Sequence, residues 1–246
     1  MQKILENGLI LRSLDEGHEN DRETLAEFYM RVFGEAEPGD EDVQTFDKWT
    51  HDLLHTNPVM ALENFFVVVD PAHDEKIVSA LMLIPQTWTY AGIEFGMGRV
   101  ELVATEKDYR RRGLVRELMD AAHERSADLG HLVQGITGIP YFYRQFGYTM
   151  AVDNLGSRCI VQFSSFAPLK DDKQPDFTLR DATPDDIPAL MVMDEFAESQ
   201  YLMTVRRDAA MWEFEIVGRH ETPYFLTGDV QMIINQDDMP VGYVML

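Results

Sequence analysis

The sequence predicts an α+β fold, and three observations lead to that prediction. Short apolar runs typical of strands alternate with longer segments whose apolar residues recur at helical spacing. Part of the order found in the first half returns near the end of the chain. The chain has 246 residues, 45% of them hydrophobic, which is enough for a substantial core in one large domain or two moderate ones.

The first half is expected to contain, in order, a strand, two helices and two strands. They cover Leu9–Arg12, Asp21–Phe33, about Asp42–His55, Phe65–Asp70 and Ile77–Ile84. Asp21 is a residue type that caps helix N-termini. The helix after it has one apolar face, made of Leu25, Phe28, Tyr29 and Val32. That face is expected to join the core.

The same order returns at Phe177. The expected elements are a strand over Phe177–Arg180, a helix to about Ser199, a helix carrying Trp212, and strands over Val230–Asn235 and Val241–Leu246. Thr183, Pro184 and Asp186 form a helix-start signature. We therefore expect a first domain at residues 1–163, a polar linker at 164–176 and a partial, non-catalytic second domain at 177–246. The chain stops inside an apolar strand, so we expect residues beyond Leu246.

Composition narrows the function. There are 21 Lys and Arg against 43 Asp and Glu, a net charge of −22, which disfavours nucleic-acid binding. The acidity either steers cationic substrates to the protein or serves solubility alone.

The single cysteine, Cys159, excludes an internal disulfide and indicates a reducing cytoplasm. No apolar run approaches the ~18 residues of a membrane span. A homo-oligomer is left open.

One stretch has the chemistry of a phosphate site. A buried strand is expected at Arg99–Ala104, then a polar turn, then a helix opened by Gly113 and running to about Leu129. The inner face of that helix is expected to comprise Leu114, Leu118, Ala121, Ala122 and Leu129. A helix N-terminus offers free N–H groups and partial positive charge, which suit phosphate. Arg110, Arg111, Arg112 and Arg116 add cations. The stretch predicts a diphosphate site; the alternative is a solvated surface turn.

Two motifs in this order resemble the GNAT superfamily of N-acetyltransferases. Tyr109–Val115, YRRRGLV, resembles its coenzyme A diphosphate loop, with Val115 where the family usually has Gly or Ala. Phe142–Tyr148, FYRQFGY, resembles its late aromatic element. The loop, this element and the tandem arrangement are similar to the enhanced-intracellular-survival branch, which acetylates aminoglycosides and lysine. The resemblance implies a mixed, mostly antiparallel sheet flanked by helices.

The resemblance also implies roles for residues. The backbone of Val103, Ala104 and Thr105 would pair with the pantetheine arm of acetyl-CoA. The segment from Arg110 through Arg111, Arg112, Gly113, Leu114 and Val115 to Arg116 would hold the diphosphate. Tyr143 stands where the family has its general acid; the alternative is a packing role among neighbouring aromatic residues. Glu101 alternates with Val103, so we expect both on one face, with Glu101 as base or as an ion-pair partner.

Other interpretations compete with these. His51 and His55, four residues apart on a helix, suit zinc or the negative end of a helix dipole, and we expect no metal. An acyl-CoA-binding sensor without activity, or a purely structural interaction module, is compatible with the same fold. We expect an acetyl-CoA-dependent N-acetyltransferase whose acceptor is a primary amine of a cationic small molecule or a lysine side chain.

Overall fold

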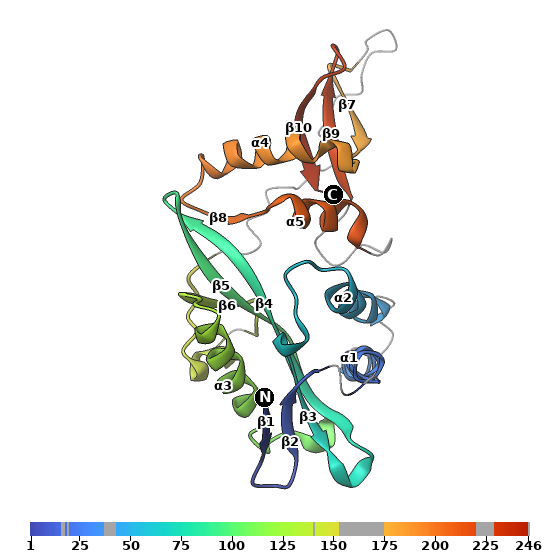
Figure 1. Cartoon of the computed structure of the whole chain (residues 1–246), viewed down its shortest axis with the longest axis vertical. Helices are drawn as coiled ribbons and strands as arrows, with labels where there is room; N and C mark the ends of the chain where they lie inside the picture. Colours follow the sequence, from blue (N-terminus) through green and yellow to red (C-terminus); the bar gives the residue numbers. More distant parts are fainter. Residues whose placement is uncertain are drawn as a thin grey trace.

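The computed structural model describes residues 1–15, 18, 20–36, 43–139, 141–152, 175–219 and 229–245 (Figure 1). Cys159, most of the expected linker at 164–176 and Leu246 lie outside them. The strands are β1 (Gln2–Ile4), β2 (Ile10–Ser13), β3 (Phe65–Asp70), β4 (Lys76–Tyr90), β5 (Ile93–Thr105), β6 (Val133–Ile136), β7 (Phe177–Asp181), β8 (Met203–Arg206), β9 (Val230–Asn235) and β10 (Pro240–Met245). The α-helices are α1 (Asp21–Ala36), α2 (Val43–His55), α3 (Leu114–Asp128), α4 (Ile187–Glu198) and α5 (Ala209–Glu213).

The larger sheet has seven strands, in the order β1-β2-β3-β4-β5-β6, with β8 also paired to β4. All pairs are antiparallel except β5 with β6, which is parallel. Strand β8 pairs with Thr87–Tyr90 of β4, while β3 pairs with residues 76–82 of the same strand. The expected mixed, mostly antiparallel sheet is thus confirmed. The contribution of β8 from the C-terminal half was not predicted.

Helices cover both faces of this sheet (Figure 1). Helices α1 and α2 pack on one face, where the apolar residues Leu25, Phe28, Tyr29 and Val32 of α1 are buried as predicted. Helix α3 packs on the other face through Leu114, Leu118, Met119, Ala121 and Ala122. Leu129, expected on this inner face, is 40% exposed. The helix ends at Asp128 and the chain turns at Gly130, so Leu129 leaves the buried stripe.

A second sheet of three strands has the order β10-β9-β7. Helices α4 and α5 pack on it, and Trp212 is fully buried in their core. The predicted helix-start signature is confirmed, since Thr183 and Asp186 form a capping box that opens a 3₁₀ turn at Pro184–Asp186, and α4 follows from Ile187. Leu179 lies opposite Ile233, as Leu11 lies opposite Val68 in the first sheet. In both sheets the register shifts within the next strand pair, which is β3 with β4 in the larger sheet and β9 with β10 in the smaller one.

The β4–β5 hairpin is longer than predicted. Strand β4 continues past Ile84 to Tyr90, and β5 begins at Ile93 rather than Arg99. Ala91 and Gly92 form the turn, with φ of 50° and 79°. The tip is bound to β8, where Ala91 N–H donates to the Leu202 carbonyl at 2.8 Å. The hairpin therefore joins the C-terminal half to the larger sheet, and its base carries the site described next.

Candidate active site

Strand β5 carries a bulge at Leu102. Glu101 lies opposite Met82 and Ala104 opposite Ala80, so β5 has one residue more than β4 in this interval. Leu102 has φ of 49°. A branched residue in this region is strained by roughly 1–3 kcal/mol, which persists only where the surroundings impose it. Bulges of this kind redirect side chains and interrupt pairing beside active sites.

The bulge corrects one sequence-based expectation. Glu101 and Val103 were expected to share a face because they alternate. Glu101 instead lies opposite Met82, whose side chain belongs to the core under α1 and α2. Val103 packs against the core under α3. The extra residue at Leu102 reverses the alternation, so the two side chains point to opposite faces.

Strands β5 and β6 separate at the same place. Their parallel pairing joins Met97–Val100 to Val133–Ile136 and then ends. In the part of the chain that the structure describes, no strand pairs with Glu101–Thr105 on the edge that faces β6. This edge has no partner strand among the described residues, so an extended ligand can pair with it. The predicted pantetheine residues Val103, Ala104 and Thr105 lie on it.

The loop after β5 is anchored at two points. Glu106 accepts hydrogen bonds from Arg31 at 2.6 Å and Lys76 at 2.7 Å. Tyr109 donates to Asp70 at the end of β3, at 2.7 Å. This bond is the largest cause lowering the pKa of Asp70 below its usual value. The loop thus has a defined shape without a ligand, which reduces the ordering cost of binding.

Beyond Tyr109 the backbone presents free donors. Arg111 and Gly113 have φ of 63° and 78°, and Gly113 precedes α3 with no side-chain cap. Among the described residues, no backbone N–H from Arg111 to Val115 has an acceptor. A turn of successive N–H groups at a helix N-terminus is an anion site. Leu114 is buried, so it offers a ligand only its backbone.

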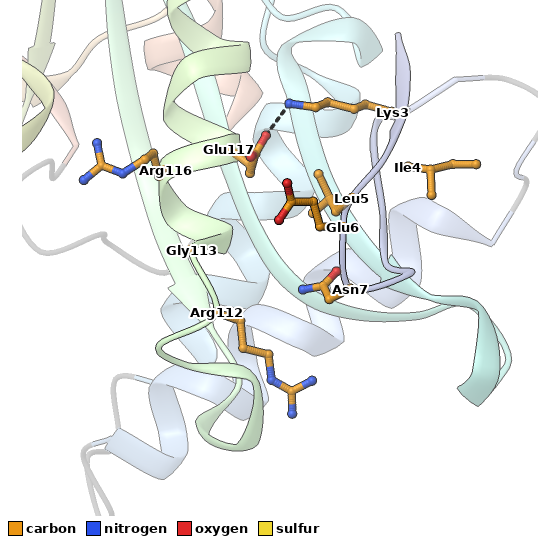
Figure 2. Close-up of a pocket in the computed structure, with 9 residues that line it drawn as sticks. All are labelled: Lys3, Ile4, Leu5, Glu6, Asn7, Arg112, Gly113, Arg116 and Glu117. Atoms are coloured by element: carbon orange, nitrogen blue, oxygen red, sulfur yellow. Dashed lines mark hydrogen bonds and ion pairs between the residues drawn. The ribbon is translucent and has the colours of Figure 1, made fainter.

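The arginines of the loop differ in their contacts. Arg112 stacks on Tyr109 at 4.7 Å from the ring centre, and Arg116 lies over Phe146 at 5.2 Å. Figure 2 shows these two side chains extending in different directions from the start of α3. Arg110 Nε donates to the Thr105 carbonyl at 3.2 Å. Positive charge therefore flanks the helix N-terminus on both sides.

A groove of about 480 Å³ lies beside this terminus, between α3 and the β1–β2 hairpin (Figure 2). Its lining comprises Lys3, Ile4, Leu5, Glu6, Asn7, Arg112, Gly113, Arg116 and Glu117. Lys3 and Glu117 form an ion pair of 2.5 Å across it. The groove thus has mixed charge, and three of the predicted diphosphate residues line it: Arg112, Gly113 and Arg116.

Tyr143 lies in the short 3₁₀ turn η4 (Phe142–Phe146), half-buried against the core under α3. A Cβ on Gly138 would come within 2.3 Å of its ring, so glycine lets the ring lie on the backbone there. Burial, and secondly the charge of Glu101, raises the pKa of Tyr143 above its usual value. A phenol in this place stays protonated and can donate a proton.

Glu101 is buried and accepts a hydrogen bond from Arg99 Nε at 2.6 Å. Burial raises the pKa of Glu101, and the Arg99 charge opposes that shift. The charge of Glu101 contributes to the raised pKa of Tyr143, although the two side chains come from different elements, β5 and η4. Arg99, Gly138 and Asp70 were not predicted, because nothing in the one-dimensional pattern marks their contacts.

His51 and His55 stack at 5.5 Å between ring centres on α2. Burial lowers the pKa of His55. Among the residues that the structure covers, no three His, Cys, Asp or Glu side chains are grouped to hold a metal ion. None of the helices in the described ranges is long and apolar enough to cross a membrane.

The region that contains the bulged strand and the glycine-opened helix matches a known family model. The model of the acetyltransferase (GNAT) domain matches residues 13–151, more than half of the chain. The chain belongs to this GNAT acetyltransferase family. A search of curated proteins gives no significant match.

Solved structures share the fold. N-myristoyltransferase of Saccharomyces cerevisiae with bound myristoyl-CoA has a TM-score of 0.68 at 13% identity, covering 100% of this chain and 61% of that one. A probable N-acyltransferase of Enterococcus faecalis has 0.61 at 17%, covering 96% and 54%. Eis1 of Mycobacterium abscessus has 0.56 at 18%, covering 96% and 52%. The chain thus spans only about half to three fifths of these proteins, and at these identities the likeness is one of fold.

Proposed function

We propose that the protein transfers an acetyl group from acetyl-CoA to a primary amine. One observation carries the proposal: the bulged end of β5, unpaired on the edge that faces β6, leads through the turn at 106–110 to the five backbone N–H groups of Arg111–Val115, which have no acceptor among the described residues. An extended thioester arm fits the first part and a diphosphate the second.

In this proposal the diphosphate of acetyl-CoA binds the N–H groups of Arg111–Val115, with the loop arginines as counter-charges. The pantetheine arm lies along Val103, Ala104 and Thr105. The thioester carbonyl then reaches the bulge, where a backbone N–H near Val103 polarises it. No metal is required, because the acyl donor is already activated as a thioester.

The reaction forms an N–C bond and breaks the C–S bond. The amine must first be neutral, so Glu101 accepts its proton, directly or through water. Tyr143 donates its proton to the leaving thiolate, and the second proton, which the nitrogen loses as it becomes an amide, returns to the Tyr143 phenolate directly or through water. The raised pKa values of both side chains support these roles, because a carboxylate of raised pKa is a stronger base and a buried phenol keeps its proton.

The acceptor we favour is a cationic small molecule, such as an aminoglycoside, or a lysine side chain. The net charge of −22 supports it, since a negative field raises the encounter rate with cations. The resemblance to the enhanced-intracellular-survival branch supports it as well. A single cysteine suits a reducing compartment, and we place the protein in the cytoplasm.

The test is release of free coenzyme A from acetyl-CoA with an aminoglycoside, spermidine and a lysine peptide. We expect release above the amine-free rate with at least one of them, at low ionic strength first. Binding of coenzyme A without release across the panel would instead support an acyl-CoA sensor. No binding at all, tested by thermal stabilisation, would leave neither role standing.

We also propose that residues 177–246 form a partial, catalytically silent GNAT-like unit joined to a first domain at 1–163. The matched register of β7 and β9 with β2 and β3 supports this. The described part after β7 contains no counterpart of the arginine loop or of Tyr143. Calorimetric titration should find one coenzyme A per chain; two equivalent sites would contradict the division.

A further inference from the structure

Two side chains of α3 contact the segment that carries Tyr143. Arg116 and His123 are seven residues apart, close to two helical turns, so they lie on one face of the helix. Arg116 Nη2 donates to Gln145 Oε1 at 3.1 Å. His123 Nε2 and the Tyr148 hydroxyl are 2.9 Å apart. Both partners follow Tyr143 within five residues of sequence.

The Gln145 amide connects α3 to the peptide group that precedes Tyr143. Its Nε2 donates to the Phe142 carbonyl at 3.1 Å, while its Oε1 accepts from Arg116. The Arg116 guanidinium also lies over Phe146. Figure 2 shows Arg116 extending away from the β1 side of the groove. The Gln145 side chain therefore fixes the start of the turn η4 relative to α3.

Tyr148 provides the second connection. Its backbone N–H donates to the Tyr143 carbonyl at 3.3 Å, and its ring meets the Tyr143 ring edge-on at 6.3 Å and 73°. Burial lowers the pKa of His123 and raises the pKa of Tyr148. Both groups are thus neutral near pH 7, and the contact is a neutral hydrogen bond.

The turn needs these connections because it has little structure of its own. Five residues of 3₁₀ helix lie between Tyr141 and Gly147, which have φ of 70° and 91°. Phe142 is 40% exposed, and Arg144 and Gln145 are exposed. A single short turn is not stable in water without packing. The direction of the Tyr143 phenol therefore depends on what holds the turn to α3.

We propose that Gln145 and Tyr148 are positioning residues for proton donation by Tyr143, acting through Arg116 and His123. This rests on the proposed role of Tyr143. Because Arg116 also belongs to the predicted diphosphate loop, the same helix face that holds the donor's phosphates sets the place of the acid. A displacement of about 1 Å at a reacting group costs up to about 10²-fold in rate.

The experiment compares Gln145→Ala and Tyr148→Phe in the coenzyme A release assay, with the amine that gives the fastest release. Each should lower kcat about tenfold, within the limit that misplacement allows. Calorimetric affinity for coenzyme A should stay within about twofold, since neither residue belongs to the loop. Tyr141→Phe is the matched control: it removes a hydroxyl from a side chain 68% exposed and should leave kcat unchanged.

A double-mutant cycle separates positioning from mere stability. In a Tyr143→Phe background, neither substitution should lower kcat further, because the group being positioned is gone. A further tenfold fall there would overturn the proposal. The proposal would also be overturned if both single variants kept the wild-type kcat while Tyr143→Phe lowered kcat strongly. Gln145 is exposed, so its variant tests the proposal even if Tyr148→Phe does not fold. Failure of acetyl transfer itself would show separately, as no release by the wild type.

Discussion

The Arg12 guanidinium in β2 forms a two-pronged ion pair with Asp21 at the start of α1. Nη1 and Nη2 donate to the two carboxylate oxygens at 2.5 Å and 2.8 Å, and both residues are buried. Arg180 and Asp186 repeat this arrangement in the C-terminal half, at 2.7 Å for each prong. There the arginine side chain is 46% exposed. The two pairs share geometry and an equally buried carboxylate, and they differ in the burial of the arginine.

Arg12→Ala should therefore destabilise the protein far more than Arg180→Ala. Removing Arg12 leaves the Asp21 carboxylate buried without its partner, at a cost of about 3–5 kcal/mol. Removing Arg180 leaves the equally buried Asp186 carboxylate with its hydrogen bonds from the Thr183 N–H and hydroxyl, and water can replace the half-exposed guanidinium, so the loss should be smaller. Urea denaturation followed by circular dichroism measures both. Equal losses would mean that burial does not determine the contribution of this pair.

Arg111→Glu combined with Gly113→Glu should abolish coenzyme A binding. The substitutions place two carboxylates beside the free N–H groups, and glutamate at φ of 78° is strained. Calorimetry measures the affinity. Gly113→Ala separates strain from charge, and Lys107→Glu changes the charge of an exposed neighbour outside the loop. Unchanged affinity in the double variant would remove the diphosphate from this loop.

Tyr143→Phe should lower kcat about 10²-fold or more, the size of a typical general-acid contribution. Coenzyme A affinity should stay nearly intact, because the phenol acts only on the leaving thiolate. Steady-state kinetics and titration of the same preparation give both values. A kcat within threefold of the wild type would assign Tyr143 to packing alone.

The acid side of the rate profile should depend on Glu101. Ionised Glu101 is the base, so kcat should fall as pH falls through its pKa. Burial places that pKa above the usual value of 4.5, so the decline should begin at higher pH than for an ordinary carboxylate. An acceptor amine of low pKa prevents its own protonation from hiding the effect. Glu101→Gln should remove this limb, and Glu94→Gln in the same strand should keep it; a limb that persists in Glu101→Gln would point to another base.

The local sequence pattern was sufficient to predict most of the helices and strands. Strands β3 and β9 have the bounds that their apolar runs predict, and the buried face of α1 follows from helical spacing. The arginine loop was visible because four cations and a glycine are consecutive or nearly so. Such features depend on neighbours in sequence, and short-range periodicity and turn chemistry encode them directly.

Contacts between residues far apart in the sequence determined the remaining features of the fold and the site. The bulge at Leu102 arises from how β5 pairs with β4, so alternation alone placed Glu101 on the wrong face. The bonds of Tyr109 to Asp70 and of Tyr148 to His123 join residues 39 and 25 positions apart. Strand β8 pairs with β4 across more than 100 residues. A single sequence contains no local signal for such contacts, because they form only when separate elements pack together.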